Sequence, residues 1–148
     1  MFRLRDASKE DYDFLYNLLK STMKQYYIEA FKKWDETLEK QYFDESFSKD
    51  VYKIIIWADY NVGCISITET DQSLFINEFQ ILPEFQNRGI GKIILKSIIE
   101  ESNRLLIPIK LEVLKVNKKA RAFYSNFGFI FDGQKEYHDS MYRNPCRE

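Results

Sequence analysis

Apolar residues recur at every third or fourth position in four stretches of the chain, the spacing that places them on one face of a helix. These stretches are residues 12–19, 21–47, 89–105 and 117–129. The second stretch is rich in aromatic and charged residues, and we expect it to be broken once. The first should begin at a capping box, in which Ser8 and Asp11 satisfy free backbone N–H groups. About four helices are therefore expected.

Seven other stretches alternate between apolar and polar residues or are rich in β-branched residues, as strands are. They are residues 1–6, 51–60, 62–70, 73–82, 109–116, 129–134 and 136–143. We predict turns between them at Tyr60–Asn61, at Asp71–Gln72 and, from its Asp-Gly pair, at Asp132–Gly133.

The order of these elements indicates a mixed sheet. A strand, a helix and another strand between residues 73 and 114 imply a parallel pair with a crossover helix, whereas the hairpin over 51–70 is antiparallel. The chain has 148 residues, with neither repeats nor a Pro/Gly/Ser linker. We therefore predict one α/β domain over residues 1–148, with a mostly antiparallel sheet of about seven strands.

The composition excludes several classes of protein. The 22 basic and 23 acidic residues nearly balance, which argues against a strongly basic nucleic-acid surface and against disorder. No apolar run reaches the roughly 18 to 20 residues that cross a bilayer, and the first residues lack the apolar region of a signal peptide. We expect a cytoplasmic protein that binds neither nucleic acid nor membranes.

The sequence contains few residues suited to a metal site or to a nucleophile. The chain has two cysteines, Cys64 in a strand and Cys146 near the C-terminus, and one histidine, His138. A histidine-based metal cluster needs more ligands, so no metal is expected. The favoured interpretations are a buried thiol, a thiol in the C-terminal tail and an ordinary strand histidine.

Two of the five glycines stand one residue apart at a strand-to-helix junction, in the stretch QNRGIGK at residues 86–92. The N-terminus of a helix offers free N–H groups and a partial positive charge, so such a loop suits an anion, phosphate above all. A Walker A loop needs a glycine where Gln86 stands and Ser or Thr where Ile93 stands. A dinucleotide fingerprint needs a glycine at Ile94, so both of these spacings fail.

The same stretch resembles the Q/R-x-x-G-x-G/A pyrophosphate loop of the GNAT superfamily of acyl-CoA-dependent N-acetyltransferases. Residues 81–85, ILPEF, are similar to the V-x-P-E-Y segment before that loop, and residues 117–129 to the family's N-x-x-A-x-x-(L/F)-Y-x-x-x-G-F segment. The opening residues resemble the family's R-x-A-x-x-x-D start. Asn87 replaces a common glycine, but asparagine tolerates left-handed angles. The resemblance covers essentially the whole chain and implies the GNAT fold, with two parallel strands that splay apart.

The resemblance also implies that acetyl-CoA is the cosubstrate. Its pyrophosphate would lie on the loop, its pantetheine arm along the strand ending at Ile81, and the Ile81 N–H would polarise the thioester carbonyl. Asn117 would reach the pantetheine arm or serve only as a helix cap. The expected cofactor-binding residues are Phe79, Ile81, Gln86, Asn87, Arg88, Gly89, Ile90, Gly91, Lys92, Asn117 and Lys119. Two further basic residues, Lys118 and Arg121, could also contact the CoA phosphates.

Two residues are candidates for the chemistry of transfer to a primary amine. The resemblance implies that Tyr124 protonates the departing thiolate, although a helix tyrosine packed on the sheet is the alternative. Glu78 interrupts an apolar strand and is the candidate base, acting through water or with a raised pKa; a solvent-facing carboxylate is the alternative. Direct attack of the amine in a ternary complex is expected.

The acceptor is left open. Residues 20–50 match the family least, and their aromatic and acidic side chains are suited either to a core or to a pocket for a cationic amine. Those side chains are Tyr26, Tyr27, Glu29, Trp34, Asp35 and Glu36. Small amines and peptide or protein amines are both possible acceptors, and a homodimer is also open. A non-catalytic acyl-CoA sensor is the principal alternative, ahead of a nucleotide-binding module.

Overall fold

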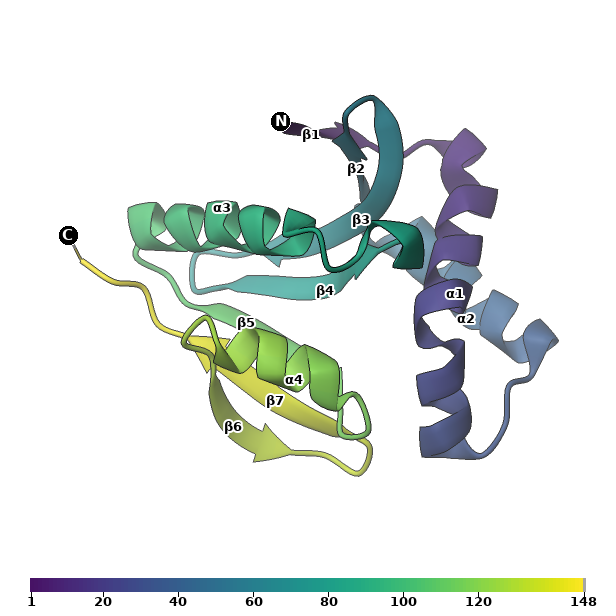
Figure 1. The fold of residues 1–148 in the computed structure, drawn as a ribbon. Coiled ribbons are helices and arrows are strands. Elements are labelled where there is room, and N and C mark those ends of the chain that lie inside the picture. The colour runs from purple at the N-terminus through teal and green to yellow at the C-terminus, as the bar shows by residue number, and fades with distance from the viewer. Residues whose placement is uncertain (148) are drawn as a thin grey trace.

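Seven strands form a single sheet in the order β1-β2-β3-β4-β5-β7-β6 (Figure 1). The structure, a computed structural model, describes residues 1–147. The strands are β1 Phe2–Asp6, β2 Lys53–Trp57, β3 Tyr60–Glu69, β4 Leu74–Ile81, β5 Ile109–Leu114, β6 Ile130–Gln134 and β7 His138–Arg143. The helices are α1 Tyr12–Phe31, α2 Glu36–Lys49, α3 Ile90–Leu105 and α4 Lys118–Ser125, with short 3-10 turns at Lys9–Asp11 and Pro83–Phe85. The predicted mixed fold is confirmed.

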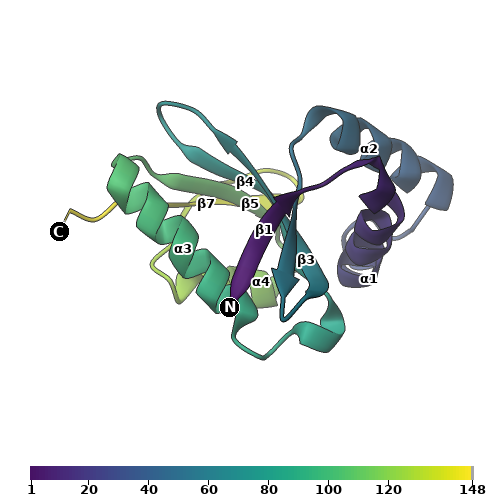
Figure 2. The same ribbon diagram turned by 90° about the horizontal axis from the view of Figure 1, so that it is seen from above.

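The sheet separates two hydrophobic cores, and successive residues of a strand enter opposite ones. Ile54, Ile56 and Cys64 pack with α1 and α2, whereas Ile55 and Val62 pack in the core that α3 and α4 cover. Alternation of side chains along β2 produces this division. In β3 the residues opposite Ile55 and Ile56 are Gly63 and Asn61, so Val62 is the extra residue of a β-bulge, which puts it on the face opposite to Cys64. Figure 2 accordingly shows α1 and α2 together on one side of the sheet and α3 on the other.

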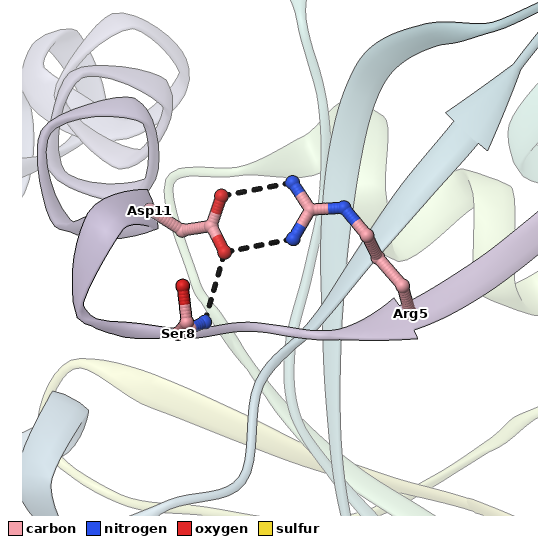
Figure 3. Close-up of polar contacts among 3 residues, drawn as sticks. All are labelled: Arg5, Ser8 and Asp11. Atoms are coloured by element: carbon pink, nitrogen blue, oxygen red, sulfur yellow. Dashed lines mark hydrogen bonds and ion pairs between the residues drawn. The ribbon is translucent and has the colours of Figure 1, made fainter.

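The capping box predicted at Ser8 and Asp11 is confirmed, and it is joined by an arginine (Figure 3). The Ser8 N–H donates to Oδ2 of Asp11 at 2.8 Å, and the Arg5 guanidinium donates to both carboxylate oxygens at 2.8 and 2.9 Å. These contacts, the Arg5 hydrogen bonds above all, lower the pKa of the Asp11 carboxyl to about 2. The network fixes the passage from β1 into α1.

The helix boundary expected near residue 20 is wrong, because α1 continues without interruption to Phe31. The Ser21 hydroxyl donates to the carbonyl of Leu18 at 2.8 Å, so it bonds within the helix and does not break it. The one break comes at Lys32, which has a left-handed φ of 67°. Asp35 then caps α2 by accepting a hydrogen bond from the backbone N–H three residues on, at 3.1 Å.

The turn between β2 and β3 lies at Ala58–Asp59 and not at the predicted Tyr60–Asn61. Both turn residues have a left-handed φ, 49° and 68°, as a two-residue hairpin turn requires. Tyr60 is already paired with Trp57. The right-handed twist of the strands selects this turn geometry even where the sequence lacks Asn-Gly.

The turn predicted at Asp132–Gly133 is also wrong, because both residues lie inside β6. Gly133 has a φ of 119° and sits where the register of β6 against β7 shifts, between Phe131 and Gln134. An Asp-Gly pair here makes an irregularity in a strand, and the connection to β7 falls at residues 135–137.

The parallel strands β4 and β5 pair over only part of their length. Leu74 lies opposite Ile109 and Ile76 opposite Leu111, after which no pairs form although β4 continues to Ile81. The two strands diverge beyond this point (Figure 1). The expected splayed pair is therefore present.

A β-bulge in β4 decides which way its later side chains point. The residues opposite Ile76 and Glu78 are adjacent in β3, so Asn77 is an extra residue. Ile76 packs in the core under α3, and after the bulge Phe79 does so as well. Glu78 therefore lies on the α1 and α2 side of the sheet.

Within residues 1–147, no helix is long and apolar enough to span a membrane. The same residues contain no group of three or more His, Cys, Asp or Glu side chains placed to hold a metal ion. Cys64 is buried and Cys146 is exposed, and both are free thiols.

Candidate active site

The glycine stretch forms a tight loop into the N-terminus of α3. Asn87 and Gly89 have left-handed φ values of 62° and 82°, so the asparagine takes the angle expected of it. The first helical hydrogen bond of α3 runs from the Ile93 N–H to the Gly89 carbonyl at 3.1 Å. The N–H groups of residues 90–92 therefore have no helical partner and are free for an anion.

Gln86 connects this loop to the end of β4. Its side-chain amide donates to the Ile81 carbonyl at 2.9 Å, and its oxygen lies 3.4 Å from the Lys119 ammonium. Arg88 instead lies over the ring of Phe85, with its guanidinium carbon 5.3 Å from the ring centre. Gln86 thus positions the loop, while the Arg88 side chain turns away from it.

A cleft of about 620 Å³, here called the loop cleft, runs beside the loop and the end of β4. It brings together ten of the expected cofactor-binding residues, all except Arg88. They are Phe79, Ile81, Gln86, Asn87, Gly89, Ile90, Gly91, Lys92, Asn117 and Lys119. Residues of α1 that the sequence did not single out line it as well, namely Ser21, Thr22 and Met23. The loop cleft is bounded by a free helix terminus, two basic side chains and an apolar strand.

The backbone of β4 offers a hydrogen-bond donor to this cleft. The Leu82 N–H donates to the Val62 carbonyl of β3 at 2.8 Å. Because successive N–H groups of a strand point to opposite edges, the Ile81 N–H points away from β3, toward the side that β5 has left. The splay therefore frees this donor.

Tyr124 lies at the junction of two cavities. It lines the loop cleft and also a second cavity of about 310 Å³, the gap cleft, between the diverging strands β4 and β5. The residue is 7% exposed, and its ring packs edge-on against Phe129. Burial, and then the charge of Glu78, raise its pKa, so the phenol is protonated at neutral pH. Asn117, which lines both cavities too, also caps α4 through a 3.1 Å hydrogen bond from the Ala120 N–H.

Glu78 reaches the gap cleft from the opposite face of the sheet. Burial raises the pKa of its carboxyl to about 7, Gln80 lowers it through a 2.7 Å hydrogen bond, and the charge of Asp50 raises it further. A carboxyl of this kind is about half ionised at neutral pH. Since β4 and β5 do not pair here, a passage through the sheet brings Glu78 and Tyr124 to one cavity.

Glu78 also lines a third cavity of about 210 Å³ between α1 and α2, here called the helical chamber. Met23, Tyr27 and Glu78 line both the helical chamber and the gap cleft. The three cavities thus follow one another from the glycine loop, past Tyr124 and Glu78, to the two helices.

Only part of the aromatic and acidic set expected around residues 20–50 lines the helical chamber. Tyr27 and Trp34 do so, whereas Tyr26 lines the loop cleft and Asp35 caps α2. Glu36 accepts hydrogen bonds from Lys20 and Trp34. Glu29 does not line any of these three cavities.

Several residues of these cavities had no signal in the sequence. Glu39 and Tyr52 line the helical chamber, and His138 lines the gap cleft from β7. Their positions depend on the packing of α2 and on the pairing of β7, which no local pattern reveals. Arg121 lies elsewhere and pairs with Asp139 at 2.6 Å.

The sequence model of the family described as the acetyltransferase (GNAT) family matches residues 13–129. The chain belongs to the GNAT acetyltransferase family. The matched range contains the glycine loop, the segments at residues 81–85 and 117–129 and both catalytic candidates, whereas the opening residues that also resemble the family lie before it.

One GNAT protein resembles part of the chain in sequence, and others resemble nearly all of it in fold. It is 33% identical over 75 residues to a [Ribosomal protein bS18]-alanine N-acetyltransferase of Salmonella typhimurium, and this match spans about half the length of either protein: 49% of this chain and 50% of the relative. The PaiA N-acetyltransferase of Thermoplasma acidophilum, solved with coenzyme A, superposes with a TM-score of 0.77 at 18% identity, over 97% of this chain and 99% of that chain. The Campylobacter jejuni N-acetyltransferase PseH, solved with acetyl coenzyme A, has a TM-score of 0.67 at 15% identity, over 99% and 100%. At these identities the two structures establish the shared GNAT fold.

Proposed function

We propose that this GNAT protein transfers the acetyl group of acetyl-CoA to a primary amine, by direct attack of the amine while both substrates are bound. The observation that carries this proposal is a series of three cavities that share lining residues and extend from a free helix N-terminus past Tyr124 to Glu78. The two ends of that series suit different partners, an anion at the loop and an amine beside the carboxylate.

The loop cleft fits a pyrophosphate with an apolar arm. Free N–H groups at the start of α3 and the ammonium groups of Lys92 and Lys119 suit the phosphates. A Cβ at Gly91 would lie 3.7 Å from Phe123 and would occupy space in which a ligand can approach the backbone. Phe79 and Ile81 suit the arm.

Acetyl-CoA, when bound, supplies an activated acetyl group with a thiolate as leaving group. In this proposal the Ile81 N–H polarises the thioester carbonyl, a contribution worth about 3 kcal/mol for one donor. Tyr124 gives its proton to the departing sulfur. The negative charge of Glu78 raises the Tyr124 pKa. Once Glu78 has taken the proton of the amine, that charge is gone and Tyr124 becomes a stronger acid.

Glu78 accepts the proton of the amine. Transfer from an amine of pKa about 10.4 to an ordinary carboxylate is uphill by about 8 kcal/mol. With the Glu78 pKa at about 7, the step costs about 5 kcal/mol. The half-buried and desolvated position of Glu78 thus makes it a better base than an exposed carboxylate.

Titration calorimetry with acetyl-CoA, CoA, ATP and NAD, followed by a thiol-release assay with a panel of amines, tests the proposal. Binding of acetyl-CoA together with thiol release for at least one amine supports it. The panel includes a peptide with an N-terminal alanine, because a protein acceptor is suggested by the name of the Salmonella relative. Binding without release for any amine would favour the non-catalytic sensor instead.

A further inference from the structure

The helical chamber holds two carboxylates that lack a cationic partner. Glu39 forms no ion pair or side-chain hydrogen bond with any residue in 1–147, and Glu78 accepts only from the Gln80 amide. Lys20 is the one basic side chain on the chamber wall within that range, and it donates to Glu36 at 2.8 Å. Two further ammonium groups lie over rings of the wall, that of Lys24 6.0 Å from the Trp34 ring centre and that of Lys40 5.3 Å from the Tyr16 ring centre, but neither forms an ion pair with Glu39 or Glu78.

Aromatic rings make up most of the remaining wall. They are those of Tyr16, Tyr27, Trp34, Tyr42, Phe43 and Tyr52. Tyr27 and Trp34 stack with their ring centres 5.8 Å apart. The faces of tyrosine and tryptophan rings attract cations, and their edges pack against methylene groups. Walls of this kind beside two carboxylates suit an alkyl ammonium ion.

An unpartnered hydroxyl provides an independent sign that a polar ligand belongs here. Tyr16 lines the helical chamber and is 7% exposed. Its buried hydroxyl makes no hydrogen bond of good geometry with the described residues, although burial and then the nearby Glu36 carboxylate raise its pKa. Both oxygens of the Glu36 carboxylate nearby accept from other groups, Lys20 and Trp34. A buried hydroxyl without a partner costs about 1 to 3 kcal/mol, which a ligand N–H can offset.

We propose that the acceptor is a short alkyl diamine or polyamine, whose second ammonium group is held in the helical chamber by Glu39 and the Tyr16 hydroxyl. This inference rests on the proposed acetyl transfer and names the class of amine that the same site takes. The chamber shares Glu78 with the gap cleft, so a molecule anchored at Glu39 extends its other nitrogen toward the base. The volume of about 210 Å³ matches a short chain and not a length of polypeptide.

The step is balanced for such an acceptor. The reacting ammonium first loses one proton to Glu78, which passes it to solvent. The neutral nitrogen then bonds to the acetyl carbon while the carbon–sulfur bond breaks. Glu78 takes a second proton from that nitrogen, Tyr124 supplies the proton of the free thiol, and the proton held by Glu78 restores the Tyr124 phenol. The product is a monoacetylated amine that keeps one ammonium group, and one proton per turnover is released to solvent.

Calorimetry on the CoA-loaded protein, comparing 1,4-diaminobutane with butylamine, tests the inference without turnover. The two probes have the same carbon chain and differ in the second ammonium group. We expect the diamine to bind roughly 10-fold or more tightly than butylamine, since one partly desolvated ion pair is worth about a factor of ten. The same ratio should appear in kcat/KM for thiol release.

The Glu39→Gln variant should remove the advantage of the diamine and leave butylamine unchanged. Glu45→Gln is the matched control, because Glu45 lies on the same helix, is exposed and does not line the chamber. Equal binding of the two amines by the parent protein would overturn the inference, and so would a preference for a peptide with an N-terminal alanine. A protein that fails to bind CoA would overturn the proposed function as well, so the two failures are distinguishable.

Discussion

The side-chain amide of Gln80 donates a 2.7 Å hydrogen bond to Oε1 of Glu78, two positions back along β4. Side chains two apart on a strand share a face, so this contact is built into the strand itself. The hydrogen bond favours the ionised carboxylate, while burial favours the neutral acid. The balance leaves the Glu78 pKa at about 7.

The pH dependence of the reaction should reflect the ionisation of the Glu78 carboxyl. We expect kcat/KM to rise with pH through an acid limb near pH 7, because the base acts only when deprotonated. Glu78→Gln should lower kcat roughly 100-fold and remove this limb, while the limb from the amine substrate at higher pH remains. A limb near 7 that persists in Glu78→Gln would assign it to another group.

Stability measurements check that the Glu78→Gln protein is folded. Folding raises the pKa of the Glu78 carboxyl. The protonated carboxyl therefore contributes to the free energy of unfolding below the unfolded pKa near 4.5, and this contribution is lost as pH rises through about 7. Glu78→Gln lacks this dependence. Relative to the parent, it should therefore gain stability between pH 4.5 and 7 in urea denaturation.

Removing the Gln80 amide should move the acid limb. Gln80→Met keeps the length of the side chain but cannot donate to the carboxylate, so the Glu78 pKa should rise and the limb should shift to higher pH. The pH profile of kcat/KM measures the shift. In the Glu78→Gln background, the same substitution should change nothing; a shift there would show that Gln80 acts on a different group.

Tyr124→Phe should lower kcat roughly 100-fold with little change in acetyl-CoA affinity, because only the proton for the thiolate is lost. The Tyr124 side chain forms no hydrogen bond with another residue in 1–147, so the fold should be unaffected. Steady-state kinetics and calorimetry provide the two readouts. Tyr137→Phe, at an exposed tyrosine next to β7, is the control. A Tyr124→Phe enzyme as fast as its parent would rule out the general-acid role.

Two alanine substitutions separate ligand binding from backbone strain in the loop. At Gly91 an added Cβ meets only ordinary contacts of 3.7 to 4.0 Å, so Gly91→Ala should keep or raise the melting temperature but weaken CoA binding by roughly 10-fold. Gly89 has a φ of +82°, so Gly89→Ala should lower the melting temperature as well. Unchanged CoA affinity in Gly91→Ala would place the pyrophosphate elsewhere.

The contribution of the Asp11 network to the free energy of unfolding should decrease at acidic pH. Folding lowers the Asp11 pKa from 3.8 to about 2, so its stabilisation is present above pH 3.8 and is lost as pH falls through 2. Asp11→Asn should cost about 2 kcal/mol of unfolding free energy at pH 7 and progressively less toward pH 2. Urea denaturation at several pH values measures this. Asp13→Asn, at an exposed residue two positions on, should cost little at any pH.

The sequence alone determined the loop and the helices around it. The left-handed Asn87, the cap at Asn117 and the free start of α3 all follow from local chemistry, in which each residue is read with its neighbours. Together with the resemblance to the GNAT motifs, this local chemistry predicted the family, the mixed sheet and ten of the residues that line the loop cleft. Local errors arose at Tyr60–Asn61 and at Asp132–Gly133, where strand twist and a bulge overrode turn preferences.

Tertiary structure decided how Glu78 meets Tyr124. Alternation alone would place Glu78 on the same face as Ile76, and only the extra residue Asn77 turns it toward α1 and α2. The end of pairing between β4 and β5 then opens the sheet between Glu78 and Tyr124. The helical chamber depends likewise on how α2 packs against α1, which brings Glu39 to Glu78 from 39 residues away. Such contacts arise from long-range packing, which leaves no periodic trace in the chain.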